Sequence, residues 1–283
     1  MENTVWTPFP IDEQIHISSM YSLFTRHYTP KFAFPGETHN FWECLYVLKG
    51  CVRVSADEKV YDMSDSEIIF HKPLELHKFV VTAPTGADLF IFSFSADGPL
   101  SEKFRDKVFR LTDFQKGKIT DLLLYMKEKT FSMELPENEH HYLEPFFQIP
   151  GYSQMVISHL YQLLLSLADE GIIATASSAP DAVIFGKAIG YLNCSLNRQP
   201  TVLEIAGFCN VSEATLKRIF DKFAGISVHK YLLKLKIKTA TELLQDGESV
   251  CNVSERLGFG SQSYFSKAYK RETGISPSNI ERK

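Results

Sequence analysis

The sequence lacks the features that mark secreted, membrane-bound and disulfide-stabilised proteins. Its five cysteines are scattered and form no CxxC pair, a pattern that fits buried thiols in a reducing compartment. No segment approaches the roughly 18 consecutive apolar residues of a membrane span. The first residues, MENTVWTPFPIDEQ, also lack the basic start and apolar run of a signal peptide. We therefore expect a cytoplasmic protein with no membrane partner.

The usual signatures of catalysis are missing as well. The chain has no Gly-rich phosphate loop, no GxSxG motif and no evident pairing of a cysteine with a histidine. Because these absences leave no candidate catalytic residue, we expect no enzyme activity.

The charge of the chain is unevenly distributed. Its 283 residues, 44% hydrophobic and 23% charged, have the composition of a soluble globular protein and the length of about two domains. Residues 180–283 contain 15 Lys and Arg against 10 Asp and Glu, a net charge of +5. Residues 1–179 contain 15 against 24, a net charge of −9, and the two parts sum to −4. This asymmetry indicates that only the C-terminal part meets a polyanion.

The first hundred residues have the pattern of β structure. Their β-branched and aromatic runs, such as FWECLYVLKGCVRVSADEKVYDMSDSEIIF, are broken by turn-forming residues. Several short strands that follow one another every 8–12 residues or so predict a barrel or a sandwich over about residues 20–98.

Helical patterns follow the β region. Residues 101–130 form a predicted helical region, and residues 153–168 form a strongly amphipathic helix. An apolar stripe as rich as that of residues 153–168 either lies on the barrel or pairs with a second copy of itself. We expect the helices of about 101–173 to pack on the barrel, and residues 153–168 to supply the interface of a homodimer.

A linker separates this region from the rest of the chain. Residues 174–180, ATASSAP, are small, polar and end in proline. We therefore predict an N-terminal domain of residues 1–173, a linker at 174–180 and a C-terminal domain of residues 181–283.

The C-terminal domain contains an internal repeat. VLEIAGFCNVSEATLKRIFDKFAGIS and VCNVSERLGFGSQSYFSKAYKRETGIS share a short helix, a tight turn, a serine cap, a second helix and a GIS ending. Ser212 and Ser261 correspond to each other, 49 residues apart. The repeat predicts two helix-turn-helix units, at about 201–223 and 250–273, in an all-α domain.

The second helix of each unit has one apolar and one polar face. Leu216, Ile219 and Phe220 in the first unit have the spacing of a buried face, as do Phe265 and Tyr269 in the second. Opposite them lie Gln, Lys, Arg and Ser side chains, which can reach base edges from the N-terminal part of a helix in the major groove. A plain helical bundle is the alternative explanation.

The long helix between the units supports DNA binding by its length. At about 17 residues and 1.5 Å per residue it spans about 26 Å, close to the ~34 Å turn of B-DNA. The second helix of each unit, one at either end of the long helix, can therefore enter successive major grooves of double-stranded DNA. Lys230 and Lys234 lie on this helix and are predicted to follow the phosphates, although such lysines also suit a solvated face.

The tail resembles a known family. ERLGFGSQSYFSKAYKRETGISPSNI is similar to the C-terminal signature of the AraC/XylS-type transcriptional regulators, and the resemblance covers about the last hundred residues. It departs at Ser254, usually alanine, and at Ala214, often a larger residue. It implies activation through contact with RNA polymerase and a small-molecule effector, most often a sugar. The residues at which it implies DNA contact are Glu213, Ala214, Lys217, Arg218, Gln262, Ser263, Ser266 and Lys267.

The N-terminal half resembles the same family, and ETHNFWECLYVLKG resembles the first motif of the cupin barrels. His39 and Glu43 match that motif, and His77 stands where the second motif has a histidine. In regulators of this family the barrel more often binds an effector without a metal. Metal-binding cupins have a histidine where Glu37 stands and Pro-x-Gly before the second histidine. We therefore expect no metal and no cofactor, although two histidines and a carboxylate can hold iron, manganese or zinc in a cupin oxygenase or isomerase.

Aromatic residues crowd the first 46 positions. They suit a pocket for a small organic ligand such as a sugar, and equally the core of a barrel. The predicted ligand-binding residues are Arg26, His39, Trp42, Glu43, Tyr46 and His77.

The sequence thus predicts an α+β protein of two domains. A cupin-like β-barrel with packed dimerisation helices forms the sensor, and an all-α domain with two helix-turn-helix units joined by a long helix binds DNA. We expect a transcriptional regulator, an activator of catabolic or transport genes, in which the effector shifts the population of DNA-binding arrangements. A regulator gated by a partner protein is the first alternative, and a cupin metalloenzyme fused to DNA-binding helices is the second.

Overall fold

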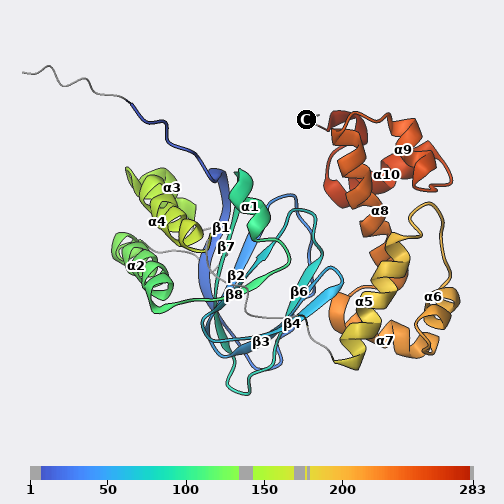
Figure 1. The fold of residues 1–283 in the computed structure, drawn as a ribbon, viewed down its shortest axis with the longest axis horizontal. Helices are drawn as coiled ribbons and strands as arrows, with labels where there is room; N and C mark the ends of the chain where they lie inside the picture. Colours follow the sequence, from blue (N-terminus) through green and yellow to red (C-terminus); the bar gives the residue numbers. More distant parts are fainter. Residues whose placement is uncertain (1–7, 134–142, 169–175, 177–178, 281–283) are drawn as a thin grey trace, which may run out of the picture.

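The computed structural model describes residues 8–133, 143–168, 176 and 179–280, and its N-terminal half is a β-barrel of two facing sheets (Figure 1). The larger sheet has the order β1-β7-β2-β5-β8 and the smaller one β4-β3-β6, with antiparallel pairing throughout. Most of the predicted linker, residues 174–180, lies outside the described residues. The strands are β1 (His16–Tyr28), β2 (Trp42–Lys49), β3 (Cys51–Ala56), β4 (Lys59–Ser64), β5 (Glu67–His71), β6 (His77–Val81), β7 (Ala87–Asp97) and β8 (Val108–Arg110).

Both faces of the larger sheet are buried, and strand β2 shows how. Successive side chains of a strand point to opposite faces. Trp42 and Tyr46 join the apolar cluster beneath the helices, whereas Leu45 and Val47 join the cluster between the two sheets. The larger sheet therefore separates an outer core, covered by helices, from the barrel interior.

Helices cover the outer face of the larger sheet (Figure 1). Residues 101–130, predicted as one helical region, instead contain three elements. Val108 and Phe109 form a strand because they pair with β5 and are buried, and Thr112 then starts a new helix through a capping box. The helices are α1 (Pro99–Lys103), α2 (Asp113–Thr130), α3 (Glu144–Gln148) and α4 (Tyr152–Ser166).

The stripe of helix α4 is buried within the chain. Val156, Leu160 and Leu164 are fully buried and belong to the cluster that includes the outer face of the larger sheet. Of the two alternatives for this stripe, packing on the barrel is the one that the structure has, so the stripe itself gives no argument for a dimer.

The C-terminal half is all-α and contains both predicted helix-turn-helix units. Ser212 and Ser261 cap the second helix of each unit, and Gly274 ends the last helix with a left-handed backbone. Helix α8 joins the two units, as Figure 1 shows. The helices are α5 (Pro180–Asn193), α6 (Val202–Phe208), α7 (Glu213–Ala224), α8 (Val228–Gln245), α9 (Val250–Arg256), α10 (Gln262–Thr273) and a 3-10 turn (Pro277–Asn279).

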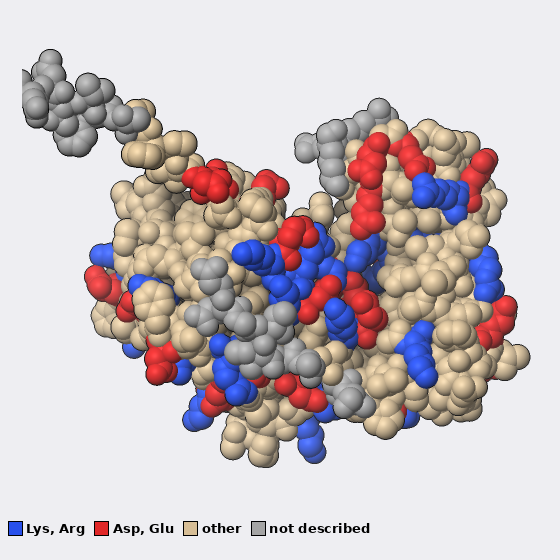
Figure 2. Space-filling model, viewed as in Figure 1, with Lys and Arg blue, Asp and Glu red and all other residues tan. Residues whose placement is uncertain are grey.

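The two halves of the chain contact each other through the smaller sheet. Val60 and Leu76 of the barrel belong to the same apolar cluster as helices α5 to α8. Around it lie polar contacts, and Figure 2 shows charged side chains of both signs gathered at this boundary. The ammonium of Lys238 lies 3.0 Å from Asp57, and Lys78 donates to the backbone oxygen of Asp221 at 2.9 Å.

Among the helices of the described residues, none has the length and apolar character needed to cross a bilayer.

The turn of the second unit requires glycine. Gly258 has a φ of +61°, and a Cβ there would lie 2.1 Å from the backbone oxygen of Asn197. We expect Gly258→Ala to lower the free energy of unfolding by at least about 2 kcal/mol, because strain and a backbone clash add. Urea denaturation measures the change.

Gly247→Ala is the matched control for this clash. Gly247 also has a left-handed backbone, with φ of +92°, but a Cβ there meets nothing within 4 Å. It should cost only about 1 kcal/mol. An equal loss of stability in the two variants would contradict the role of the Asn197 contact.

Candidate functional site

The second helix of the second unit presents its N-terminal end to solvent. Phe265 and Tyr269 are buried, and the Tyr269 hydroxyl lies 3.0 Å from the Thr241 hydroxyl of α8, which fixes α10 on α8. On the opposite side, Gln262 and Lys267 are exposed. Ser263 is exposed and Ser266 is half-buried. This surface has the composition and the position that base recognition requires.

The second helix of the first unit, α7, presents a smaller polar surface. Ala214 and Lys217 are exposed, and Lys217 lies 3.6 Å from the carboxylate of Glu213. Arg218 is already engaged, because both of its terminal nitrogens lie 3.1 Å from the carboxylate of Asp181 on α5. The structure therefore gives Arg218 a role in holding α7 on α5, which the sequence did not reveal.

Asp181 also binds a second cation of α7. The ammonium of Lys222 lies 2.8 Å from its carboxylate. Hydrogen bonds from Arg218 and Lys222 lower the pKa of Asp181 to about 2. The charge network therefore persists at neutral pH.

The lysines of helix α8 separate into different environments. Lys230 is exposed. Lys234 is half-buried against the barrel, with its ammonium 3.4 Å from the Thr38 hydroxyl, and burial lowers its pKa. In this arrangement Lys234 lies at the contact between the two halves and not on an open face, contrary to its expected place along phosphates. Periodicity could not show this, because the barrel covers one side of the helix.

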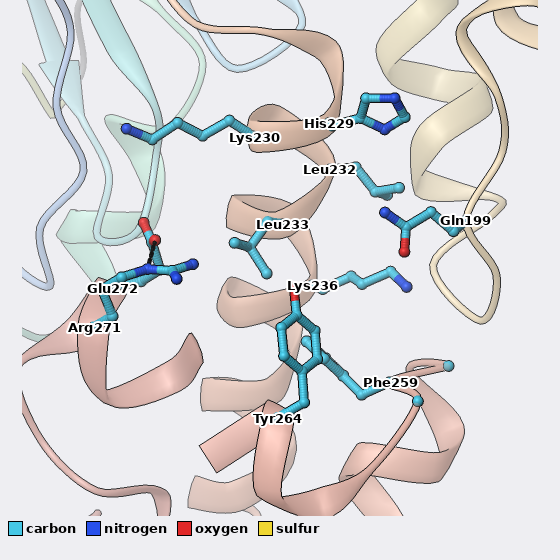
Figure 3. A pocket seen from close by; sticks show the side chains of 12 residues that line it. Gln199, His229, Lys230, Leu232, Leu233, Lys236, Phe259, Tyr264, Arg271 and Glu272 are labelled. Atoms are coloured by element: carbon cyan, nitrogen blue, oxygen red, sulfur yellow. Dashed lines mark hydrogen bonds and ion pairs between the residues drawn. The ribbon is translucent and has the colours of Figure 1, made fainter. Parts of the chain in front are cut away.

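A hollow of about 640 Å³ lies beside α8, between the two helix-turn-helix units (Figure 3). Lys236 is buried there with its ammonium 5.4 Å from the centre of the Phe259 ring. Figure 3 shows Lys230 extending to the other side of the helix from His229 and Gln199.

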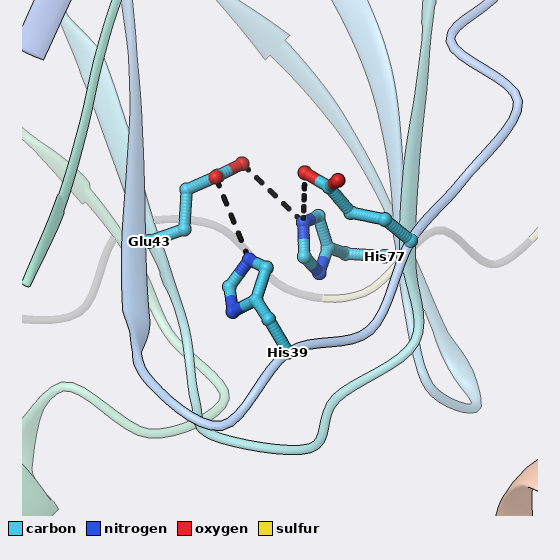
Figure 4. A group of neighbouring side chains, drawn as sticks. His39, Glu43 and His77 are labelled. Atoms are coloured by element: carbon cyan, nitrogen blue, oxygen red, sulfur yellow. Dashed lines mark ion pairs between the residues drawn. The ribbon is translucent and has the colours of Figure 1, made fainter. Parts of the chain in front are cut away.

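A second cluster lies in the barrel, where His39, Glu43 and His77 converge (Figure 4). Nε2 of His39 lies 3.5 Å from Oε2 of Glu43, and Nε2 of His77 lies 3.3 Å from Oε1 of Glu43. Glu37 completes the cluster, with Oε1 3.6 Å from Nε2 of His77. Backbone pairing between Glu37 and His77 brings the loop before β2 onto β6.

The charges of this cluster support one another. Burial by itself would lower the pKa of His77, but the carboxylates of Glu37 and Glu43 raise it to about 10. Burial would raise the pKa of Glu43, yet His39 and His77 hold it well below its usual range. The buried, cationic imidazole of His77 therefore lies between two carboxylates, of which that of Glu37 is 45% exposed and that of Glu43 is 14% exposed.

His71 and Glu75 extend the cluster, and sequence reasoning missed both. Nδ1 of His71 lies 2.6 Å from the Glu75 carboxylate, and both side chains are buried. The ring of His71 stacks on that of His77, with centroids 4.3 Å apart. His71 lies opposite Glu43 in the antiparallel pair of β2 and β5, and no local pattern of the sequence indicates this pairing.

Three of the predicted ligand-binding residues lie elsewhere. Trp42 and Tyr46 are on the outer face of the larger sheet and are buried beneath helices, so they do not line the barrel interior. They alternate with Glu43 along β2, and this alternation was available in the sequence. Arg26 lies over the rings of Phe24 and Tyr28 and lines a different hollow, beside helix α2.

The barrel interior contains a cavity of about 410 Å³ next to the cluster. Tyr21 and Phe41 stack at its wall with ring centroids 3.9 Å apart. Glu37, His39 and Glu43 supply its polar end. An aromatic wall opposite a few polar groups is typical of sites for small organic molecules.

Comparison with known proteins agrees with this architecture. Residues 205–283 match the family of helix-turn-helix domains, and residues 20–100 match the family of AraC-like ligand binding domains. The chain is 25% identical over 249 residues to the uncharacterized HTH-type transcriptional regulator YidL of Escherichia coli strain K12, covering 85% of this chain and 75% of that protein.

Two further relatives cover different shares of the chain. The raffinose operon transcriptional regulatory protein RafR of Pediococcus pentosaceus is 32% identical over 95 residues, 33% of this chain and 34% of that protein. The crystal structure of ToxT from Vibrio cholerae covers 93% of this chain and 95% of its own, with 11% identity and a TM-score of 0.37.

Both domain families and the similarity to the regulator YidL lead to one conclusion. The chain belongs to the AraC family of DNA-binding transcriptional regulators, which are not enzymes.

Proposed function

We propose that this regulator binds two successive major grooves through α7 and α10 and that a small molecule in the barrel cavity controls this binding. The observation that carries the proposal is the pair of capped helices with exposed polar N-terminal ends at opposite ends of α8. Helix α8 has 18 residues, which correspond to about 27 Å. This length suits recognition helices one turn of B-DNA apart.

The proposed effector is a sugar-type molecule. Carboxylates and imidazoles hydrogen-bond to hydroxyl groups, and the cavity offers Glu37, His39 and Glu43 at one end. Its stacked wall of Tyr21 and Phe41 offers apolar surface to the carbon side of a sugar ring. A regulator named for a raffinose operon among the relatives agrees with this class.

Gating follows from the contact between the halves. Thr38 lies beside the cavity residue His39 and contacts Lys234 of α8. Thr38 and His39 belong to the loop before β2. A molecule that binds one arrangement of this loop more tightly than another therefore shifts the population of arrangements of the DNA-binding domain. We further propose activation of catabolic or transport genes by contact with RNA polymerase in the cytoplasm.

The homodimer proposed from the sequence uses the outward face of the helical layer. Leu124 of α2 is 60% exposed, and Met155 and Leu165 of α4 are each 46% exposed. Helices α2 and α4 pack side by side. Covering these side chains removes apolar surface from water, which supports pairing of two copies through α4.

Base recognition by α10 is testable by substitution. A site is first selected from random duplexes with the full chain. Gln262→Ala should then weaken binding to that site by about 1–3 kcal/mol while binding to unrelated DNA is unchanged. Lys270→Ala, in the last turn of α10 and also exposed, should weaken both alike. Equal losses for Gln262→Ala on both duplexes would refute its role in specificity.

Effector binding is testable by thermal stability across a panel of mono- and disaccharides. A sugar that binds the native state must raise the melting temperature. Phe41→Ala should abolish the rise because it removes half of the stacked wall, whereas Phe131→Ala, at an 86% exposed position after α2, should keep it. If no sugar stabilises the wild-type chain, control by a partner protein becomes the favoured alternative.

Dimerisation is testable by light scattering of the full chain. Leu165→Glu should shift the mass from two copies to one, because a charge would be buried at the interface. Val183→Glu changes a side chain of similar exposure on α5 and should leave the dimer intact. A mass that Leu165→Glu does not alter would contradict the proposed interface.

A further inference from the structure

We propose that Lys236 binds a phosphate of the DNA backbone between the two major grooves, from within the hollow of about 640 Å³ beside α8. The inference rests on the proposed binding of DNA through α7 and α10, and it adds a contact that lies on neither of these helices. It also assigns the phosphate contact of α8 to a side of the helix other than that of Lys234, which the barrel covers. A phosphate contact carries no sequence information and fixes the position of a protein along the duplex.

The Lys236 side chain is buried, and its charge has no anionic partner. Only 4% of the residue is exposed. Within the described residues its ammonium makes no ion pair and no hydrogen bond, and it lies 5.4 Å from the centre of the Phe259 ring. Burial lowers the pKa of this ammonium. Because a buried cation without an anion is costly, a negatively charged group that enters the hollow would be stabilised there.

The lysines of α8 are divided between different sides of the helix. Lys234 and Lys238, four residues apart, both contact the barrel. Lys236 and His229 are seven residues apart, which places them on one side of a helix. Figure 3 shows both side chains on the same side of α8 as Gln199. The barrel therefore takes two lysines of this helix and leaves Lys236 to the hollow.

The lining of the hollow has more positive than negative charge. Among the described residues that form it, Lys230, Lys236 and Arg271 are cationic, and Glu272 has the one carboxylate. That carboxylate is already engaged, because an oxygen of it lies 3.1 Å from Nε of Arg271. The hollow therefore attracts an anion and offers Lys236 for a direct contact with it.

The hollow borders the N-terminal end of α10, which indicates the source of the anion. Residues 258–260, the turn before α10, line it together with Tyr264 of the first turn of that helix. Tyr264 is 54% exposed and follows Gln262, the residue proposed to read bases, by two positions. A duplex that receives α10 in its major groove brings the phosphates beside that groove to this rim. The Gln199 amide and the Tyr264 hydroxyl can donate further hydrogen bonds to phosphate oxygens.

The walls of the site are fixed by packing. A Cβ at Gly258 would lie 2.1 Å from the backbone oxygen of Asn197, so the loop before α6 packs directly on the turn before α10. The Phe259 ring lies 4.9 Å from that of Phe265, which is buried in the core of the second unit. Because Phe259 also lies beside the ammonium of Lys236, the cation is already in place before an anion arrives, and binding does not have to order it.

The test uses the full chain and a duplex selected with it from random sequences. Lys236→Met should weaken binding to this duplex and to unrelated DNA by the same factor. It should also make the slope of log affinity against log salt concentration shallower by about 0.9, because one phosphate contact is lost. Ethylation interference locates the contact. We expect ethylated phosphates between the two major grooves to block binding of the wild-type chain, and the block at these phosphates to be lost in Lys236→Met.

Thermal unfolding without DNA distinguishes a phosphate site from a lysine that only supports the fold. Methionine is unbranched like lysine and has no charge, so Lys236→Met removes a buried cation that lacks an anion. The free variant should therefore melt at the temperature of the wild-type chain or above it. A lower melting temperature together with an unchanged salt slope would overturn the proposal. If Lys236→Met does not fold, Gln199→Ala, at an exposed loop position, should weaken the block at the same phosphates.

Lys187→Met is the matched control, because Lys187 is an exposed lysine of α5 that does not line the hollow. It removes the same charge and should keep the ethylation pattern of the wild-type chain. A wild-type chain without interference between the two grooves, or an unchanged pattern in Lys236→Met, would overturn the site. Specificity that depends on Gln262 would survive either result, whereas a wild-type chain that selects no duplex would refute the proposed DNA binding itself.

Discussion

The structure depends on helix α8, whose sides are buried by three different partners. Leu232 and Leu235 belong to the core of the first helix-turn-helix unit, and Ile237 and Leu244 belong to that of the second. Lys238 reaches the barrel. Because cores are close-packed and transmit strain, this helix fixes the distance between the two helix-turn-helix units and ties both to the barrel.

The barrel side of that contact is formed by the smaller sheet and by the loop before β2. Its charged groups form a chain: Lys72 bridges Asp57 and Glu75, Glu75 binds His71, and His71 stacks on His77. Because Asp57 also contacts Lys238 of α8, the histidine cluster of the barrel is linked to α8 through continuous contacts. The proposed effector would therefore have a short physical route from the cluster to the DNA-binding domain.

The sequence predicted what depends on local patterns and missed what depends on the meeting of distant segments. Serine caps, the repeat and the buried faces of α7 and α10 follow from spacing, and each is present. The strand at Val108–Arg110 was missed because pairing with β5 overrides local pattern.

The site residues divide in the same way. His39, Glu43 and His77 meet, as the resemblance to the cupin motifs implied. Trp42 and Tyr46 were predicted in the wrong place because the prediction did not apply the alternation of side chains along a strand. The partner of Arg218, the barrel contact of Lys234 and the place of Glu37 depend on tertiary contacts across 37, 196 and 40 positions of the chain, and no local pattern records them.

The central claim is that one chain reads two successive major grooves through helices held by α8. Methylation interference on a duplex selected by the full chain tests it most directly, since it reports contacts at guanines in the major groove. The account predicts two patches of interference on one face of the duplex, about one helical turn apart, for each bound chain. A single patch per chain, or interference spread without preference along the duplex, would contradict it.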